Sequence, residues 1–299
     1  MNILVKFFKK NKHLNVFWKE ILLFLITQIL GIVVAVKTSK ILITLNVEIE
    51  QVSLSSFLIY FLIFTLAILA LLKVSKKGGG IIFQIFFVLA IFSGLDILFS
   101  IFIGEPGAMI LAFGLVILRF IRPTVLLHNL VVIGGLAGVG GMLGLTLIPR
   151  DAIILLVILA IYDVIAVYKT KHMVKMAETM IKKRAILGII VPEKLSGFYG
   201  SMADVEKDKF QKKEKNTRPK TAKMGRFMVL GGGDLALPLL LISSVAVNNI
   251  WQSIIILFFS LLGLTAMHFI FIKLKSKPMP ALPPLAVFSI LGYFVSLLI

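Results

Sequence analysis

The sequence predicts an all-α, polytopic membrane protein with nine transmembrane helices. Three observations predict this class: 59% of the 299 residues are hydrophobic, only 15% are charged, and the mean hydropathy is +1.03. Soluble globular proteins are about 45–50% apolar and about 25% charged. The composition therefore excludes a soluble enzyme, a disordered chain and a secreted disulfide scaffold. The absence of cysteine also excludes disulfides and thiolate metal sites.

Nine apolar stretches have a length suited to crossing a bilayer, which takes about 20 residues. They are residues 20–36, 52–72, 81–103, 107–121, 125–148, 151–169, 227–247, 250–272 and 280–298. The fourth stretch is short, and prolines interrupt the start of the ninth. The chain thus divides into residues 1–169 with spans one to six, a connection over 170–226, and residues 227–299 with spans seven to nine.

The first span follows a basic segment, as a signal peptide does. It ends at Lys-Thr-Ser-Lys (37–40) rather than at a small-residue cleavage site, which predicts an uncleaved helix. The fifth span carries six glycines, and the pairs 134/138 and 140/144 allow another helix to approach closely.

The connection over 170–226 is basic, and the sequence predicts a flexible cytoplasmic loop. Its first half has apolar residues suited to the membrane surface, including the run 186–191. Its second half, from Asp204 to Lys223, is polar and Lys-rich and is expected to be flexible.

The basic residues predict the topology. Of the 32 lysines and arginines, 29 fall on the N-terminus and on alternate connections, and the other three are Lys37, Lys40 and Arg150. Because positive residues stay cytoplasmic, we expect a multi-pass protein of the cell membrane with its N-terminus in the cytoplasm and its C-terminus outside. The net charge of +18 therefore marks orientation, and no nucleic-acid partner is expected.

Three carboxylates lie inside apolar spans: Asp96, Asp163 and Asp234. An intramembrane carboxylate costs at least a few kcal/mol, so each is a functional candidate. At about 1.5 Å of rise per residue, Asp163 and Asp234 both lie about 9–12 Å from the cytoplasmic boundary on consecutive antiparallel spans. Asp96 lies in the outer half, where a polar contact between helices is the expected role.

Two facing carboxylates are a known catalytic arrangement. Like charges close together do not both ionise cheaply, so the pair shares a proton. The ionised member activates a water as a general base, and the protonated member polarises a peptide carbonyl. This is aspartic-protease chemistry, and it needs neither a metal nor a cofactor.

The residues around Asp234 suit such a site. Gly231, Gly232 and Gly233 precede it and leave the backbone open to another chain. Pro238 cannot donate to the carbonyl of Asp234, so the helix is predicted to be weakened at the aspartate.

A proline-rich segment is expected at the same level. Four prolines fall within residues 278–284, so we expect the chain to enter the membrane extended. Extended backbone offers free N–H and C=O groups that could pair with an unwound substrate.

These residues resemble the three signatures of the presenilin and signal peptide peptidase family of intramembrane aspartyl proteases. The signatures are Tyr162-Asp163, Gly231-Gly232-Gly233-Asp234 and Pro280-Ala281-Leu282, in order along the chain. The resemblance implies a presenilin-like fold, and its small size is similar to compact archaeal homologues. The predicted orientation is that of presenilins.

Residue roles follow from this resemblance. It implies a catalytic pair, Asp163 and Asp234. It implies substrate binding at Tyr162, Gly231, Gly232, Gly233, Pro280, Ala281 and Leu282. It also implies transmembrane helical proteins as substrates, no cofactor, and activity without partner subunits. The family often has a larger residue at the position of Gly232, so the substrate preference there stays open.

Two other functions remain to be weighed at this stage. A transporter or ion leak pathway also uses buried aspartates and broken helices, but the sequence has no inverted repeat and its two carboxylates lie near one face. A non-catalytic membrane chaperone would need both aspartates to be incidental. The four histidines lack ligand spacing, so no metal site is expected.

Overall fold

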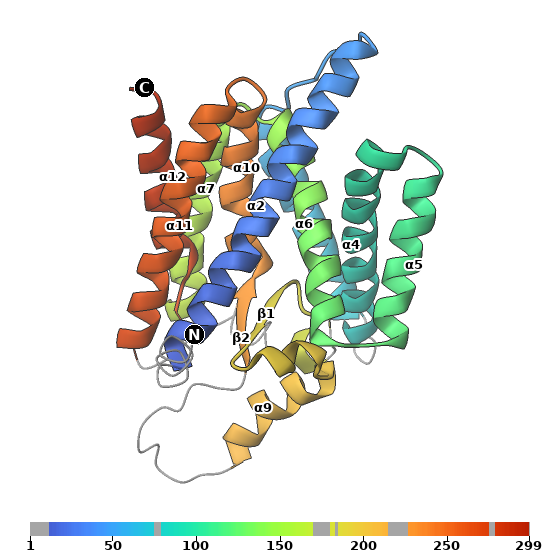
Figure 1. Cartoon of the computed structure of the whole chain (residues 1–299), viewed down its shortest axis with the longest axis vertical. Helices are drawn as coiled ribbons and strands as arrows, with labels where there is room; N and C mark the ends of the chain where they lie inside the picture. The colour runs from blue at the N-terminus through green and yellow to red at the C-terminus, as the bar shows by residue number, and fades with distance from the viewer. Residues whose placement is uncertain are drawn as a thin grey trace, which may run out of the picture.

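The computed structural model describes residues 12–74, 79–169, 180–182, 185–214, 227–274 and 279–298. A bundle of apolar helices forms most of the molecule, and a two-stranded sheet with a polar helix lies at one end of it (Figure 1). The first described helix starts at this end, whereas the last one finishes at the opposite end.

Within the described ranges, each predicted span corresponds to one apolar α-helix. The helices are α2 (Lys12–Thr44), α3 (Leu54–Val74), α4 (Gly79–Ile103), α5 (Gly107–Ile121), α6 (Val125–Thr146), α7 (Pro149–Val164), α10 (Gly232–Ala246), α11 (Ile250–Lys273) and α12 (Leu282–Ser296). A π-helical turn, η1 (Ile165–Lys169), extends α7. The structure confirms a helical membrane architecture.

Length separates eight of these helices, all but α3, into two groups. Five segments, 14–44, 84–103, 125–146, 149–169 and 250–273, are long and apolar enough to cross a membrane. By contrast, α5, α10 and α12 are apolar but have 15 residues each. At about 1.5 Å per residue, these three are shorter than a hydrocarbon core of about 30 Å. Nine complete crossings therefore stay a prediction.

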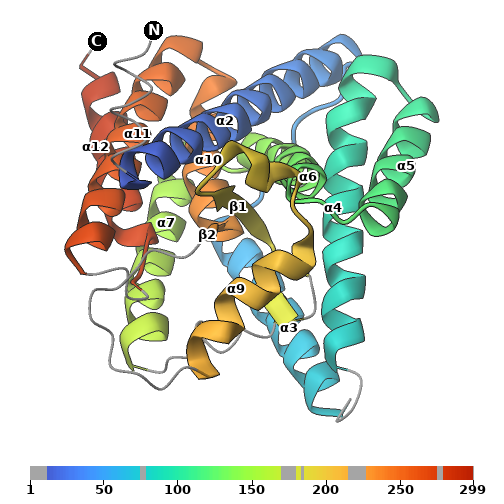
Figure 2. The ribbon, with the colours of Figure 1, turned by 60° about the horizontal axis from the view of Figure 1, so that its bottom comes forward.

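An antiparallel hairpin lies at the end of the bundle where α2 begins. Strand β1 (Gly188–Pro192) pairs with β2 (Phe227–Gly231), with Gly188 opposite Gly231 and Pro192 opposite Phe227. Every residue of β1 is buried. Figure 2 shows the hairpin surrounded by helices, and its β-branched apolar residues suit a strand that is covered on both faces.

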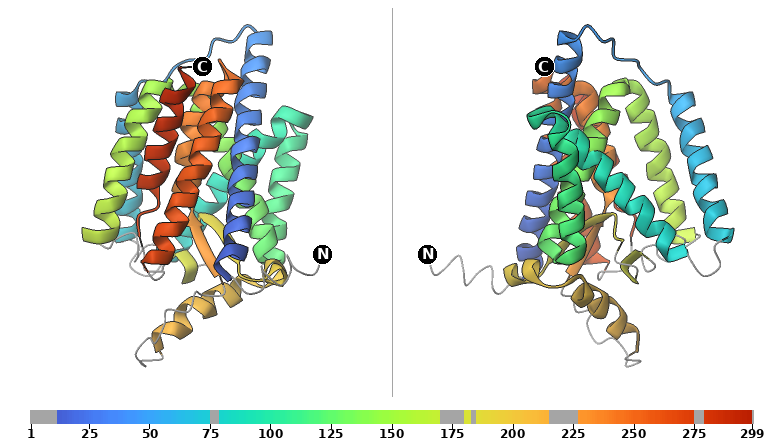
Figure 3. Two further views of the ribbon diagram at one scale, coloured as in Figure 1. Left: turned by 60° about the vertical axis from the view of Figure 1, so that its left-hand side comes forward. Right: turned by 90° about the vertical axis from the view of Figure 1, so that its right-hand side faces the viewer.

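A short 3-10 helix, η2 (Leu195–Tyr199), and the polar helix α9 (Met202–Glu214) follow β1. α9 projects from the end of the bundle (Figure 3). Its start is tied to the start of α6, because the Met202 N–H donates to the Pro123 carbonyl over 2.8 Å.

Two predictions for this region are wrong. The seventh span, expected over 227–247, begins with strand β2, and its helix starts only at Gly232. The loop expected over 170–226 contains β1 and α9. The hairpin joins segments far apart in sequence, which hydropathy does not reveal. α9 had a local signal, since the Ser201 N–H donates to Asp204 while the Ser201 hydroxyl accepts from the Ala203 N–H, a close relative of the capping box.

Glycines bring the neighbours of α6 into close contact. A methyl group added at Gly138 would collide with the Gly94 carbonyl of α4, and one at Gly141 would lie 2.6 Å from the Gly31 carbonyl of α2. A methyl group at Gly144 would collide with Ser243 of α10. The prediction that these glycines allow close helix packing is confirmed, and α6 is packed against three helices at once.

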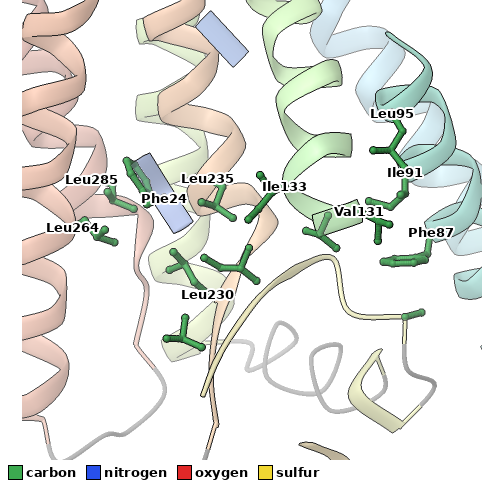
Figure 4. Close-up of a cluster of buried hydrophobic side chains, with 14 of the residues drawn as sticks. Phe24, Phe87, Ile91, Leu95, Val131, Ile133, Leu230, Leu235, Leu264 and Leu285 are labelled. Atoms are coloured by element: carbon green, nitrogen blue, oxygen red, sulfur yellow. The ribbon is translucent and has the colours of Figure 1, made fainter. Parts of the chain in front are cut away.

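One apolar cluster joins the bundle to the hairpin (Figure 4). It includes Phe24 of α2, Ile133 of α6, Leu230 of β2, Leu235 of α10 and Leu285 of α12, all of them buried. Fully burying an apolar side chain of this size stabilises a fold by about 1.5–3 kcal/mol. The cluster surrounds the junction of β2 and α10, so it fixes the position of the first turn of α10.

Candidate active site

Asp163 lies near the end of α7 and is 5% exposed. Its Oδ2 accepts a hydrogen bond of 3.2 Å from the Leu282 N–H, and the Ala281 N–H donates to the same carboxylate. These two groups are the free donors at the start of α12, because Pro283 and Pro284 have no N–H. Asp163 therefore serves as the N-terminal cap of α12.

The proline-rich segment differs from the prediction. The chain was expected to be extended over 278–284, but α12 begins at Leu282 and has Pro283 and Pro284 in its first turn. Proline is tolerated there because first-turn N–H groups have no partner within the helix. The N–H groups of Ala281 and Leu282 are bound to Asp163 and are not free for a substrate.

Asp234 lies in the first turn of α10, directly after β2. The Gly231 N–H donates to its carboxylate, the same backward contact that a capping box makes. A carboxylate in the first turn is also favoured by the helix dipole. As a whole residue, Asp234 is half-buried.

The three glycines before Asp234 meet different surroundings. A methyl group on Gly231 would lie 2.9 Å from Oδ2 of Asp234, and one on Gly232 would lie 2.9 Å from the Leu187 carbonyl. The Gly232 N–H donates to that carbonyl over 2.8 Å. Among the described residues, a methyl group on Gly233 would meet nothing within 4 Å. Gly231 and Gly232 are thus required by packing, and Gly233 faces open space.

Pro238 lies inside a continuous α10, and the helix is not interrupted at the aspartate. The carbonyl of Asp234 still lacks the donor that residue 238 would supply. One residue further, Gln28 of α2 donates to the Leu235 carbonyl over 2.9 Å. The first turn of α10 is therefore held from α2 as well as from its own backbone.

The two carboxylates approach one another. α7, α10 and α12 are in mutual contact and lie side by side in Figures 1 and 3. Asp163 and Asp234 are close enough for their charges to interact. The predicted pairing across consecutive helices thus agrees with their placement. Tyr162 is different, because it is 53% exposed on the outside of α7.

A third carboxylate near the pair was missed from the sequence. Glu20 of α2 is fully buried, accepts a hydrogen bond of 2.8 Å from Nδ1 of His268 in α11, and its charge interacts with that of Asp234. The predicted first span began at Glu20, so the residue was counted as a span end. The actual helix begins at Lys12. The buried Oδ1 of Asp96 has no hydrogen-bond partner among the described residues, so the polar contact expected there is not seen at this atom.

Comparison with known proteins identifies the family. The sequence model described as "Signal-peptide peptidase, presenilin aspartyl protease" matches residues 21–299. The chain belongs to this family. It is therefore an intramembrane aspartyl protease, an integral membrane hydrolase, and the transporter alternative is not supported.

Solved structures of the presenilin family share the fold. One presenilin family intramembrane aspartate protease is 25% identical with a TM-score of 0.57, and the match covers 92% of this chain and 94% of that one. A second structure, from another crystal form, is 24% identical with a TM-score of 0.60, covering 93% and 96%. No curated protein sequence matches.

Proposed function

We propose that Asp163 and Asp234 are the catalytic pair of this protease and that they hydrolyse peptide bonds within transmembrane segments. The observation that carries the proposal is their convergence from α7 and α10, each carboxylate held by backbone N–H groups. Among the residues that the structure describes, backbone donors hold both carboxylates, and no ion pair with a lysine or arginine is seen at either.

The reaction needs one proton on the pair. The ionised carboxylate takes a proton from water as the water oxygen attacks the peptide carbonyl carbon, and the protonated carboxylate donates to the carbonyl oxygen. The tetrahedral intermediate then collapses. The C–N bond breaks, the amide nitrogen receives a proton, and the products are a carboxylic acid and an amine.

A transmembrane substrate must be unwound to expose its peptide bond, and β2 offers a partner for the unwound segment. Side chains of α6 bind Ile190 and Gly188 of β1 on the side away from β2. In an antiparallel sheet, residue pairs that hydrogen-bond to each other alternate with pairs whose N–H and C=O groups point outward. Ile190 points outward, so Val229 opposite it also directs its N–H and C=O away from β1.

The outer edge of β2 is available for strand pairing. Among the described residues, no backbone hydrogen bond reaches β2 from that side. A substrate strand paired there would run toward Gly231 and Asp234. Gly233 has room for it, since a Cβ at this position meets none of the described residues within 4 Å. Pro280, Ala281 and Leu282 then act by placing Asp163, and Tyr162 contacts the substrate only at the outer face of α7.

Cleavage by the purified chain tests the catalytic proposal. We expect the protein alone, in detergent, to cut a single-span reporter and to be inhibited by a hydroxyl isostere of the tetrahedral intermediate. Asp163→Ala and Asp234→Ala should each reduce the rate at least about 10³-fold, far more than the modest loss of stability expected when a capping carboxylate is removed. Cleavage that survives either substitution, or ion flux without cleavage, contradicts the proposal.

The same proposal places the active-site end in the cytoplasm of a cell membrane. The distribution of 29 basic residues supports this orientation. Because the chain has no cysteine, single cysteines at Glu48 and Lys207, both exposed, report it directly. Glu48 follows the end of α2 and Lys207 lies in α9, and the end of α2 and helix α9 lie at opposite ends of the bundle in Figure 1. We expect an impermeant maleimide to label Glu48→Cys on intact cells and Lys207→Cys only after lysis; the reverse pattern overturns the orientation.

A further inference from the structure

The outer edge of β1 is occupied by side chains from α6. Asn129 makes two hydrogen bonds to Ile190: its Nδ2 donates to the Ile190 carbonyl over 2.7 Å, and its Oδ1 accepts from the Ile190 N–H over 2.8 Å. Nε2 of His128 lies 3.1 Å from the Gly188 carbonyl. The amide of Asn129 thus reproduces the pairing that a neighbouring strand would give.

The third contact comes from α2. Nζ of Lys19 donates to the carbonyls of Pro192 and Glu193, each over 2.8 Å. Lys19 is 8% exposed. Gly188, Ile190 and Pro192 are alternate residues of β1, so the outward carbonyl of every second residue is bound by a side chain. We name Lys19, His128 and Asn129 the β1 clamp.

Arg119 of α5 fixes the ring of His128. One guanidinium nitrogen lies 3.4 Å from Nδ1 of His128. Arginine only donates, so Nδ1 accepts and the ring hydrogen is on Nε2. Nε2 therefore donates to the Gly188 carbonyl. Arg119 also lies over the ring of Phe87 from α4, 4.6 Å from its centroid, so two helices support this contact.

The two edges of the hairpin therefore differ. A strand edge with unpaired N–H and C=O groups accepts another strand. The β1 clamp blocks strand pairing at the outer edge of β1, so the outer edge of β2 is the one left for an added strand. The clamp also ties the hairpin to α2 and α6, and α6 is itself packed on its glycines against three helices.

We propose that the β1 clamp determines which peptide bond of the substrate is cut. By holding β1, it fixes β2 relative to α7 and so sets the register of the added substrate strand against Asp163 and Asp234. This inference rests on the proposed function, in which the substrate pairs with β2 and the two aspartates hydrolyse it. Strand pairing that slips by two residues keeps every side chain on its face and moves the substrate by about 6.8 Å.

The products of cleavage test the inference. Mass spectrometry of the peptides cut from the single-span reporter gives the ratio of the main cut to cuts at neighbouring bonds. For His128→Leu we expect this ratio to fall about 2- to 10-fold, the change produced by one lost hydrogen bond, with new cuts two residues away. Asn129→Ala loses two hydrogen bonds, so its ratio should fall at least as far. Lys19→Met should act in the same direction.

Conservative and matched variants separate positioning from folding. The amide nitrogen of His128→Gln can still donate to the Gly188 carbonyl, so we expect the wild-type products. Gln252→Ala removes an amide-to-carbonyl bond of 3.2 Å to Ser296 at the far end of the bundle, and it should also leave the products unchanged. Binding of the hydroxyl isostere should change less than about threefold in the clamp variants, because both aspartates remain.

A clamp that only stabilises the fold would give a different result from one that sets the cleavage position. If Asn129→Ala, His128→Leu and Lys19→Met lower the rate but leave the product pattern of the wild type, the inference is wrong. Failure of the proposed function is distinct, because it shows as cleavage by Asp163→Ala or Asp234→Ala, whatever the clamp variants do.

Discussion

Asp163 and Asp234 are held by backbone N–H groups over very different distances along the chain. The bond from Leu282 to Asp163 joins residues 119 positions apart, whereas Gly231 lies three positions before Asp234. The local contact belongs to one turn at the junction of β2 and α10. The distant contact exists only when α12 is docked on α7, so it makes half of the site dependent on helix packing.

The largest expected effect comes from removing the acid–base function of either aspartate. Asp163→Asn and Asp234→Asn keep the size and the acceptor oxygen of each side chain but remove its ability to hold the shared proton. We expect each to lose at least about 10³-fold in cleavage rate, measured on the single-span reporter. A variant that kept a tenth of the wild-type rate would show that its aspartate is not part of a catalytic pair.

The next largest effect comes from disturbing the local contact between Gly231 and Asp234. Gly231→Ala places a methyl group 2.9 Å from Oδ2 of Asp234 and should lower the cleavage rate about 100-fold, because a displacement of about 1 Å costs this much. Gly114→Ala on α5 is the matched control, since a methyl group there meets nothing within 4 Å among the described residues, and its rate should stay within about threefold. Equal losses in both variants would contradict the assigned surroundings of the two glycines.

A smaller effect comes from breaking the distant contact between Leu282 and Asp163. Leu282→Pro removes the N–H that Asp163 accepts, in a first turn that tolerates proline. Leu282→Ala loses similar packing but keeps this N–H. A hydrogen bond to a charged group contributes about 1.5–3 kcal/mol, so we expect Leu282→Pro to be at least about tenfold slower than Leu282→Ala. Equal rates would mean that this bond does not place Asp163.

The smallest expected effect comes from changing Glu20, the buried carboxylate whose charge interacts with that of Asp234. Glu20→Gln keeps the shape of the buried side chain and weakens its bond of 2.8 Å with His268. We expect a loss of about 1 kcal/mol in the free energy of unfolding and a cleavage rate within about threefold of the wild type. A loss of activity as large as that of Gly231→Ala would instead assign Glu20 a direct part in the reaction.

Much of the helical architecture was predictable from the sequence because hydropathy is a local property. The nine apolar stretches correspond to the nine apolar α-helices of the described ranges, and the glycines of α6 predicted close packing. The boundaries were less accurate where polar residues lie within a helix. Glu20 was placed at a span end although α2 begins eight residues earlier.

The candidate site was predictable to the extent that its geometry is local. Glycines before an aspartate indicated the tight turn at Asp234. Three features depend on distant segments: the hairpin of 188–192 with 227–231, the cap that Asp163 provides for α12, and the pairing of Glu20 with His268. No periodicity within one segment encodes a partner more than 30 residues away, so these features required the structure.

The glycine contacts of α6 have a consequence for mutational surveys of this protein. Any larger residue at Gly138, Gly141 or Gly144 meets backbone or side-chain atoms of another helix, so such variants should be lost as unfolded protein and not recovered as stable inactive enzyme. Variants of the two clamp residues that α6 carries, His128 and Asn129, should instead persist in the membrane and release peptides of altered length. A survey that scores both protein abundance and product mass would therefore separate these two classes of substitution along a single helix, α6.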